Sequence, residues 1–223
     1  MVSTIRTEAL RLGFVACGVA RADVVDKAHQ QYFLDWLQKG GNAEMHYMER
    51  YQDLRFDPRL LHPGTRSIIS VAMASSLECY HEELKNKLHL LCQNVGLSGY
   101  RVFVDSAPVL ERYWAQKAGL GWIGRNHNLI IPQKGSQFYL GEIFTDLEMD
   151  YDMPMDSRCG ECDICIKTCP GRALGEWFDA GKCISYLTIE DPRLGPVRRN
   201  PEYAKQHGLP YGCLRCQQAC PHC

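Results

Sequence analysis

The chain has 223 residues and a formal net charge of −1, with 45% apolar and 23% charged residues, as expected of a globular protein with a packed core. Domains commonly hold roughly 100–150 residues, so one large domain and a small second one are expected. The near-zero charge excludes a protein coated with basic residues for non-specific nucleic-acid binding. No apolar run reaches the ~18 residues that span a membrane, and the N-terminus resembles an amphipathic helix, not a signal peptide; we therefore expect a cytoplasmic protein.

The beginning of the chain alternates patterns of helix and strand. Helices are predicted near Ser3–Gly13 and around Lys27–Lys39, and Gly40 and Gly41 end the second one. The apolar, β-branched run Arg66–Met73 predicts a buried strand in the centre of a sheet.

A helix and a short strand are predicted next, from about Tyr80 to Val95 and over Arg101–Asp105. Ser106 is expected to cap a further helix, because its hydroxyl can accept from the free amides of the first turn. Pro108 is tolerated in that first turn, and Gly119 ends the helix.

Two apolar runs, His127–Ile131 and Gln137–Phe144, predict further strands. Near Asp156 the composition changes abruptly to cysteine, glycine and short helical pieces. We therefore predict an α+β fold with two parts: an N-terminal domain of residues 1–155, in which helices accompany a mixed sheet, and a small ferredoxin-like domain of residues 156–223.

Nine of the twelve cysteines lie between Cys159 and Cys223, and in a reducing cytosol such clustering favours metal binding over disulfides. One run has the spacing C-x2-C-x2-C-x3-C-P of bacterial ferredoxins, in which three thiolates bind one 4Fe-4S cluster and the fourth binds another. Its members are Cys159, Cys162, Cys165 and Cys169, before Pro170. A second run ends before Pro221 and contains Cys213, Cys216 and Cys220, with Cys183 upstream.

The crossed arrangement of such pairs divides these eight cysteines between two clusters. The first is expected to take Cys159, Cys162, Cys165 and Cys220, and the second Cys169, Cys183, Cys213 and Cys216. A structural zinc ion held by the pairs 159/162 and 213/216 is the alternative, but it leaves the four-cysteine run and both Cys-Pro steps without a role.

The remaining cysteines are expected to have no ligand role. Cys223 should fray as the last residue of the sequence. Cys17, Cys79 and Cys92 are scattered and are expected to be small buried apolar residues.

Several segments occur together in the order of a known family. They are VDSAPVLERYWAQKAGLGWIGRNHNLI, GSQFYLGEIFTDL, CGECDICIKTCPGRAL, CISYLTIE and YGCLRCQQACP, preceded by MHYMERYQDLRFDPRLLHPGTRSII. With these motifs the chain resembles the epoxyqueuosine reductase family. The resemblance implies a corrinoid-binding, nitroreductase-like first domain and an oxidoreductase that converts epoxyqueuosine to queuosine in tRNA, the last step of queuosine synthesis. The implied cofactors are cobalamin and two 4Fe-4S clusters.

The resemblance also implies roles for three residues outside the cysteine runs. Asp105 matches the proton donor of the family and is expected to lie under the corrin, while Arg55 and Ser185 fall at positions of corrinoid contacts. A helix beginning beside Asp105 would stabilise its carboxylate, so desolvation would have to offset this effect before the acid could donate a proton. The residues taken alone also allow helix caps at Asp105 and Ser185 and a surface ion pair at Arg55.

The sequence departs from the family at three places. Only ASSLEC separates Met73 from Tyr80, where a longer loop usually helps to enclose the corrinoid. The basic segment around Arg198 and Arg199 could meet tRNA phosphates but lacks the usual Ile-Gly-Asn-Arg sequence. The sequence given stops three residues after Cys220, before the helical repeats with which many members grip tRNA.

The expected partners are tRNA and a low-potential electron donor such as flavodoxin or ferredoxin, with no membrane, and the protein is expected to be a monomer. Two alternatives remain open. One is a paralogous corrinoid and iron-sulfur reductase with another substrate, which the departures favour. The other is a non-enzymatic electron-transfer protein of the ferredoxin type.

Overall fold

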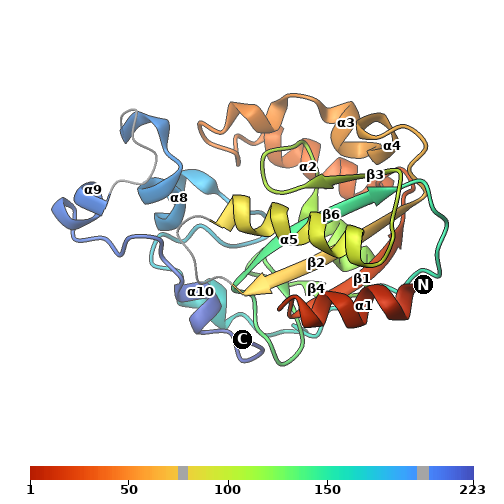
Figure 1. Cartoon of the computed structure of the whole chain (residues 1–223). Helices are drawn as coiled ribbons and strands as arrows, with labels where there is room; N and C mark the ends of the chain where they lie inside the picture. The colour runs from red at the N-terminus through yellow and green to blue at the C-terminus, as the bar shows by residue number, and fades with distance from the viewer. Residues whose placement is uncertain (75–79, 195–200) are drawn as a thin grey trace.

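A four-stranded antiparallel sheet forms the centre of the first part of the chain (Figure 1). The computed structural model describes residues 1–74, 80–194 and 201–223; Cys79, Arg198 and Arg199 lie outside these ranges. The strand order is β1-β2-β6-β3, and a separate two-stranded ribbon pairs β4 with β5. The strands are β1 (Ala16–Arg21), β2 (Ser67–Ala74), β3 (Tyr100–Phe103), β4 (Trp122–Ile123), β5 (Leu129–Ile130) and β6 (Phe138–Thr145).

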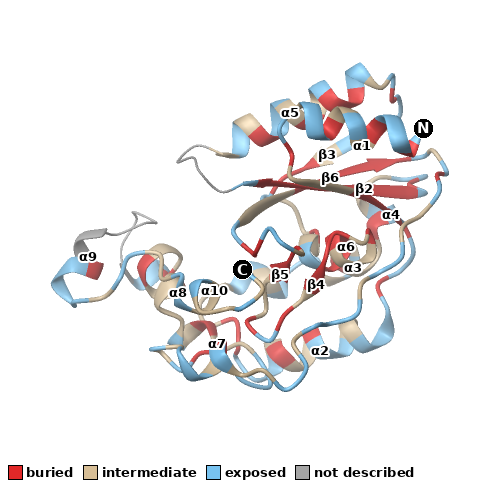
Figure 2. Cartoon of the chain, turned by 90° about the horizontal axis from the view of Figure 1, so that it is seen from below, coloured by how far each residue is buried: buried red, intermediate tan, exposed pale blue. Residues whose placement is uncertain are grey.

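Helices cover both faces of this sheet: α1 and α5 lie on one face, and α6 lies on the other (Figure 2). Within the described residues, no helix combines the length and apolarity needed to cross a membrane. The α-helices are α1 (Val2–Arg11), α2 (Lys27–Gln38), α3 (Gln52–Phe56), α4 (Pro58–Leu61), α5 (Tyr80–Asn94), α6 (Glu111–Lys117), α7 (Ile164–Lys167), α8 (Ile184–Ile189), α9 (Pro201–Gln206) and α10 (Arg215–Gln218), and the 3-10 helices are η1 (His46–Glu49), η2 (Ala180–Lys182) and η3 (Pro192–Leu194).

Strand β2 is buried over almost its whole length because helices cover both faces of the sheet. Side chains alternate between the two faces along a strand. Ile69 and Val71 therefore pack with α1 and α5, whereas Ile68 and Ala72 pack with α6. The predicted central strand and the α+β fold are both confirmed.

The predicted helix start at Ser106 is wrong. Helix α6 begins at Glu111, and residues 104–110 form a loop. Asp105 has a φ of +51°, in the left-handed region, which a right-handed helix cannot contain. Pro108 also disfavours the helical conformation of the residue before it.

Strand β1 was not predicted, because its small residues lack the β-branched pattern that marks a strand. It forms nevertheless by pairing along its whole length with β2. Gly18 has a packing role there: an added Cβ would lie 2.0 Å from the carbonyl oxygen of Ala118, so only glycine lets β1 approach the end of α6 this closely.

Helix α5 offers a matched test of this core. Leu88 is 0% exposed and Leu90 is 42% exposed on the same helix. We expect Leu88→Ala to lower the free energy of unfolding by about 2–5 kcal/mol, because it leaves a cavity against the sheet. Leu90→Ala should change it by less than about 0.5 kcal/mol. Anaerobic denaturant titration followed by far-UV circular dichroism measures both, and equal effects would contradict this description of the core.

Candidate functional site

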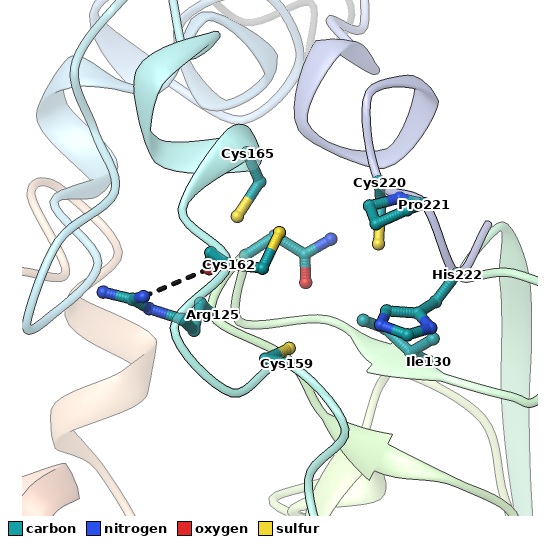
Figure 3. A pocket seen from close by; sticks show the side chains of 9 residues that line it. Arg125, Ile130, Cys159, Cys162, Cys165, Cys220, Pro221 and His222 are labelled. Atoms are coloured by element: carbon teal, nitrogen blue, oxygen red, sulfur yellow. Dashed lines mark hydrogen bonds between the residues drawn. The ribbon is translucent and has the colours of Figure 1, made fainter.

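Four cysteines surround one small hollow in the C-terminal part of the chain (Figure 3). Cys159 and Cys162 lie in the loop before α7, Cys165 lies in α7, and Cys220 follows α10. The Arg125 guanidinium donates a hydrogen bond of 3.1 Å to the carbonyl oxygen of Cys162, which fastens this loop to the first part of the chain. These four residues are the set predicted for the first cluster.

The other four cysteines form a second neighbouring group. Burial, and then the nearby thiols of Cys183, Cys169 and Cys213, raise the pKa of Cys216 to about 12. Burial also raises the pKa of Cys183, with Cys169 and Cys213 again contributing. The structure therefore brings the eight cysteines together in the two sets that the crossed arrangement predicts.

The two groups lie next to each other. The Asn126 side chain lines the hollow of the first set and donates a hydrogen bond of 3.5 Å to the carbonyl oxygen of Cys216, a member of the second. Cys165 of the first set also lies close enough to Cys216 to affect its thiol. Redox groups in these two places would be neighbours.

Each set fits a 4Fe-4S cluster by its donor chemistry, since four thiolates bind one such cluster. Among the described residues, no three Cys, His, Asp or Glu side chains converge as the ligands of a single metal ion do. A cubane does not require this convergence, because each thiolate binds a different iron. Cluster binding must also release protons, since buried thiols such as Cys216 are protonated at neutral pH without a metal.

Asp105 lies in the loop that follows β3, with its side chain 58% exposed. The Tyr80 hydroxyl donates a hydrogen bond of 2.9 Å to Asp105 Oδ2, and His81 Nε2 lies 3.3 Å from the same oxygen. The backbone N–H of Asp105 donates a hydrogen bond of 2.6 Å to Glu111 Oε1. The expected helix N-terminus beside Asp105 does not exist, because α6 begins only at Glu111; the helix-cap alternative is therefore wrong.

Two glutamates near Asp105, Glu111 and Glu142, were not predicted as site residues from the sequence. Burial raises the pKa of Glu111 to about 7, and the Asp105 charge adds to this effect. Glu142 in β6 is fully buried, both of its carboxyl oxygens lack a hydrogen-bond partner, and burial raises its pKa well above the usual range. A glutamate inside the apolar run FYLGEIF was the available signal, since buried charges are costly.

Arg55 is not a surface residue, and Ser185 is not a helix cap. Arg55 is only 7% exposed, and its guanidinium donates to the carbonyl oxygens of Tyr47 and Arg50, so the surface ion-pair alternative is wrong. Cys183 occupies the N-cap position of α8, so Ser185 is not the cap. In the described part of the chain, no hydrogen bond or ion pair joins either residue to Asp105.

Outside the two sets, Cys92 is fully buried, and burial raises the pKa of the partly buried Cys17 to about 12, as expected of inert thiols. Cys223 was expected to fray. It is instead held by a backbone hydrogen bond to the Cys220 carbonyl oxygen, and its sulfur lies 3.2 Å from Ser136 Oγ.

An α+β domain joined to two sets of four thiols defines an iron-sulfur protein of the two-cluster class. A family model described as a 4Fe-4S double cluster binding domain matches residues 158–223. The predicted two-cluster domain is thereby confirmed, while the individual ligands remain predictions.

Relatives that match along the whole chain identify the family. The chain is 37% identical to the epoxyqueuosine reductase of Cellulophaga algicola, over 97% of its own length and 77% of that protein. It is 38% identical to the same enzyme of Leadbetterella byssophila, over 97% and 78%. The chain belongs to the epoxyqueuosine reductase family, which confirms the resemblance and the class of oxidoreductase.

Solved structures agree. The epoxyqueuosine reductase of Streptococcus thermophilus has a TM-score of 0.82 at 27% identity, covering 98% of this chain and 65% of that one. An epoxyqueuosine reductase with an epoxyqueuosine-modified tRNA-Tyr stem loop has a TM-score of 0.80 at 25% identity, covering 98% and 64%. The chain thus spans a little under two thirds of these solved chains.

Gly171 offers a test of the second cysteine set. A Cβ added at Gly171 would lie 1.9 Å from the carbonyl oxygen of Lys182, so a side chain there would push Cys169 away from Cys183. We expect Gly171→Ala to lose about half of the bound iron, as one of two clusters fails to form. At Gly175 the nearest such atom is 4.0 Å away, so Gly175→Ala is the matched control. Iron and sulfide analysis of both purified variants measures the cluster content. A full complement of iron in Gly171→Ala would contradict the close approach of Gly171 to Lys182.

Glu142 should change how the free energy of unfolding depends on pH. Folding raises its pKa above the ordinary 4.5, so the unfolded chain binds fewer protons and stability falls as pH rises from that value. Between pH 5 and 7 we expect Glu142→Gln to make this decline shallower by about 1.4 kcal/mol per pH unit. Denaturant titrations at several pH values test this, with Glu82→Gln on the exposed face of α5 as control. Parallel curves for wild type and Glu142→Gln would show that Glu142 ionises normally.

Proposed function

We propose that this chain reduces epoxyqueuosine to queuosine in tRNA, with two 4Fe-4S clusters and cobalamin as cofactors. The observation that carries the proposal is the combination, in one fold of the epoxyqueuosine reductase family, of an exposed acid at Asp105 with two neighbouring sets of four thiols. Conversion of an epoxide to an alkene consumes two electrons and two protons and releases water. The clusters and the acid match these two requirements.

The proposed electron path runs through the two cysteine sets. Cys159, Cys162, Cys165 and Cys220 bind one cluster, and Cys169, Cys183, Cys213 and Cys216 bind the other. The contact from Asn126 to Cys216 supports a short path between them. Each cluster carries single electrons at low potential, so successive transfers supply the pair that the reaction needs.

Asp105 is the proposed proton donor to the oxygen that leaves the epoxide. The Tyr80 hydroxyl donates to Asp105 Oδ2, which leaves Oδ1 as the oxygen able to carry the proton. Because 58% of this side chain is exposed, the substrate can reach it from outside and solvent can reprotonate it.

The surroundings of Asp105 also suit a planar macrocycle. Tyr80 and Tyr139 stack face to face beside it with ring centroids 3.5 Å apart, so aromatic surface and acid meet in one place. Cobalamin, when bound, supplies a metal centre whose reduced form is a strong nucleophile or reductant. Asp105, Arg55 and Ser185 are the residues that we propose to contact it.

Each of the two domains has its own role in the proposed reaction. Residues 1–155 form the catalytic, corrinoid-binding domain, and residues 156–223 form the ferredoxin-like domain. tRNA is the substrate, and the electrons come from a low-potential donor such as flavodoxin or ferredoxin. The protein acts as a monomer.

The test is turnover of tRNA that carries epoxyqueuosine, using anaerobically reconstituted protein, cobalamin and a low-potential donor, with queuosine measured by mass spectrometry. Asp105→Asn should lower kcat about 10²–10⁴-fold, because it removes the acid but keeps a residue that tolerates positive φ. Ser106→Ala, an exposed change in the same loop, is the control.

Each other outcome has a definite meaning. Unchanged turnover in Asp105→Asn would refute the proton-donor role. No turnover by wild type despite cobalamin binding would favour a paralogous reductase with another substrate. No cobalamin binding and no turnover would favour an electron-transfer protein.

A further inference from the structure

A carboxylic acid lies inside the sheet, where the proposed reaction gives it no role. Glu142 in β6 is 0% exposed and lies on the same face as Phe144, which packs with α6. Ser70, the residue paired with Glu142 on the neighbouring strand β2, is also fully buried. The Ser70 hydroxyl and both Glu142 oxygens lack hydrogen-bond partners among the described residues. A carboxylate in such a place would be very unfavourable, so Glu142 is a neutral acid.

Glu111 connects this buried acid to the surface. It is the first residue of α6, and its carboxylate interacts electrostatically with Glu142 on one side and with Asp105 on the other. Glu111 Oε1 accepts the backbone N–H of Asp105 at 2.6 Å. The positive charge of the neighbouring Arg112 offsets part of the negative charge of the Glu111 carboxylate. The Glu111 charge also contributes to raising the pKa of Tyr80, after burial and Asp105. Three carboxyl groups thus run in sequence from the core to the surface.

The contact with Glu111 matters because of the backbone conformation of Asp105. A non-glycine residue with a φ of +51° is in a sparsely populated region, and the surroundings must hold it there. Tyr80 and His81 contact the side chain of Asp105, whereas Glu111 contacts its backbone. A hydrogen bond to a charged acceptor is roughly twice as strong as a neutral one.

We propose that Glu111 is a positioning residue that holds the Asp105 backbone in its left-handed conformation, and that Glu142 supports it as a buried, uncharged acid. Two adjacent carboxyl groups do not both ionise readily, so a neutral Glu142 allows Glu111 to carry the charge that strengthens its contact. The relevance of this contact to catalysis rests on the proposed function, in which Asp105 donates the proton; the contact itself does not.

Hydrogen–deuterium exchange of the cluster-containing full chain tests the contact without any assay of activity. Glu111→Ala removes the acceptor, and Glu111→Asp is too short to reach, so both should exchange the Asp105 amide about tenfold faster or more. Glu111→Gln keeps an acceptor oxygen but removes the charge, so its Asp105 amide should exchange faster than in wild type and more slowly than in Glu111→Ala. Glu142→Gln, an uncharged isostere, should leave this amide protected.

The matched control is Asp152→Asn. Asp152 Oδ2 accepts the backbone N–H of Val19 at 2.8 Å in β1, the opposite edge strand from β3. This substitution should leave exchange in residues 104–110 unchanged. Wild-type exchange at Asp105 in both Glu111→Ala and Glu111→Asp would overturn the positioning role. Faster exchange in Glu142→Gln would overturn the support by a neutral acid.

Kinetics connect the contact to the reaction. Glu111→Ala should lower kcat at least tenfold with the KM for tRNA changed less than about twofold, and Glu111→Gln, which keeps an acceptor but not the charge, should recover only part of the loss. Added to Asp105→Asn, Glu111→Ala should cost little more, because both changes act through one group. Full additivity would overturn the role in catalysis. If wild type does not reduce epoxyqueuosine, the proposed function fails while the exchange data still decide the contact.

Discussion

Each 4Fe-4S cluster requires four thiolates in one place, and this requirement organises the C-terminal third of the chain. In the predicted crossed arrangement neither cysteine run supplies all four ligands of one cluster, and Cys220 lies beside the loop that holds Cys159 and Cys162. The Gly212 backbone N–H donates to Thr188 Oγ1 at 3.1 Å, which fastens the last run to α8. The same geometry places the two cysteine sets side by side.

The first part of the chain is organised by a sheet covered on both faces. Covering both faces buries almost all of β2 and the second half of β6, and Glu142 is buried with them. Helix α6 packs against that face, so its first residue, Glu111, lies close to both Glu142 and the loop after β3. The covering that stabilises the fold therefore also puts an unusual group of acids beside Asp105. Arg125 and Asn126, which follow the β4 strand, reach the cysteine loops and link this domain to the clusters.

Strong local patterns were predictable from the sequence. The β-branched run at β2 and the periodicity of α5 depend on neighbouring residues, and both elements form where they were expected. Local patterns failed where long-range contacts decide. Strand β1 is stabilised by pairing with β2, and the residues after Ser106 remain a loop because Asp105 and Pro108 oppose the helix. The role of Glu142 depends on which strand face is covered, and no local spacing contains that information.

The chemistry of the chain was predictable from the sequence: eight cysteines at ferredoxin spacing, an acid at residue 105 and the family to which the motifs point. Spacing carries this information because each ferredoxin run places its cysteines only three or four residues apart. The tertiary structure was needed to show that Arg55 is buried against carbonyl oxygens and that Glu111 accepts a hydrogen bond from the backbone N–H of Asp105. Burial and contacts between distant segments arise from packing, so the fully buried position of Glu142 inside the covered sheet became clear only from the structure.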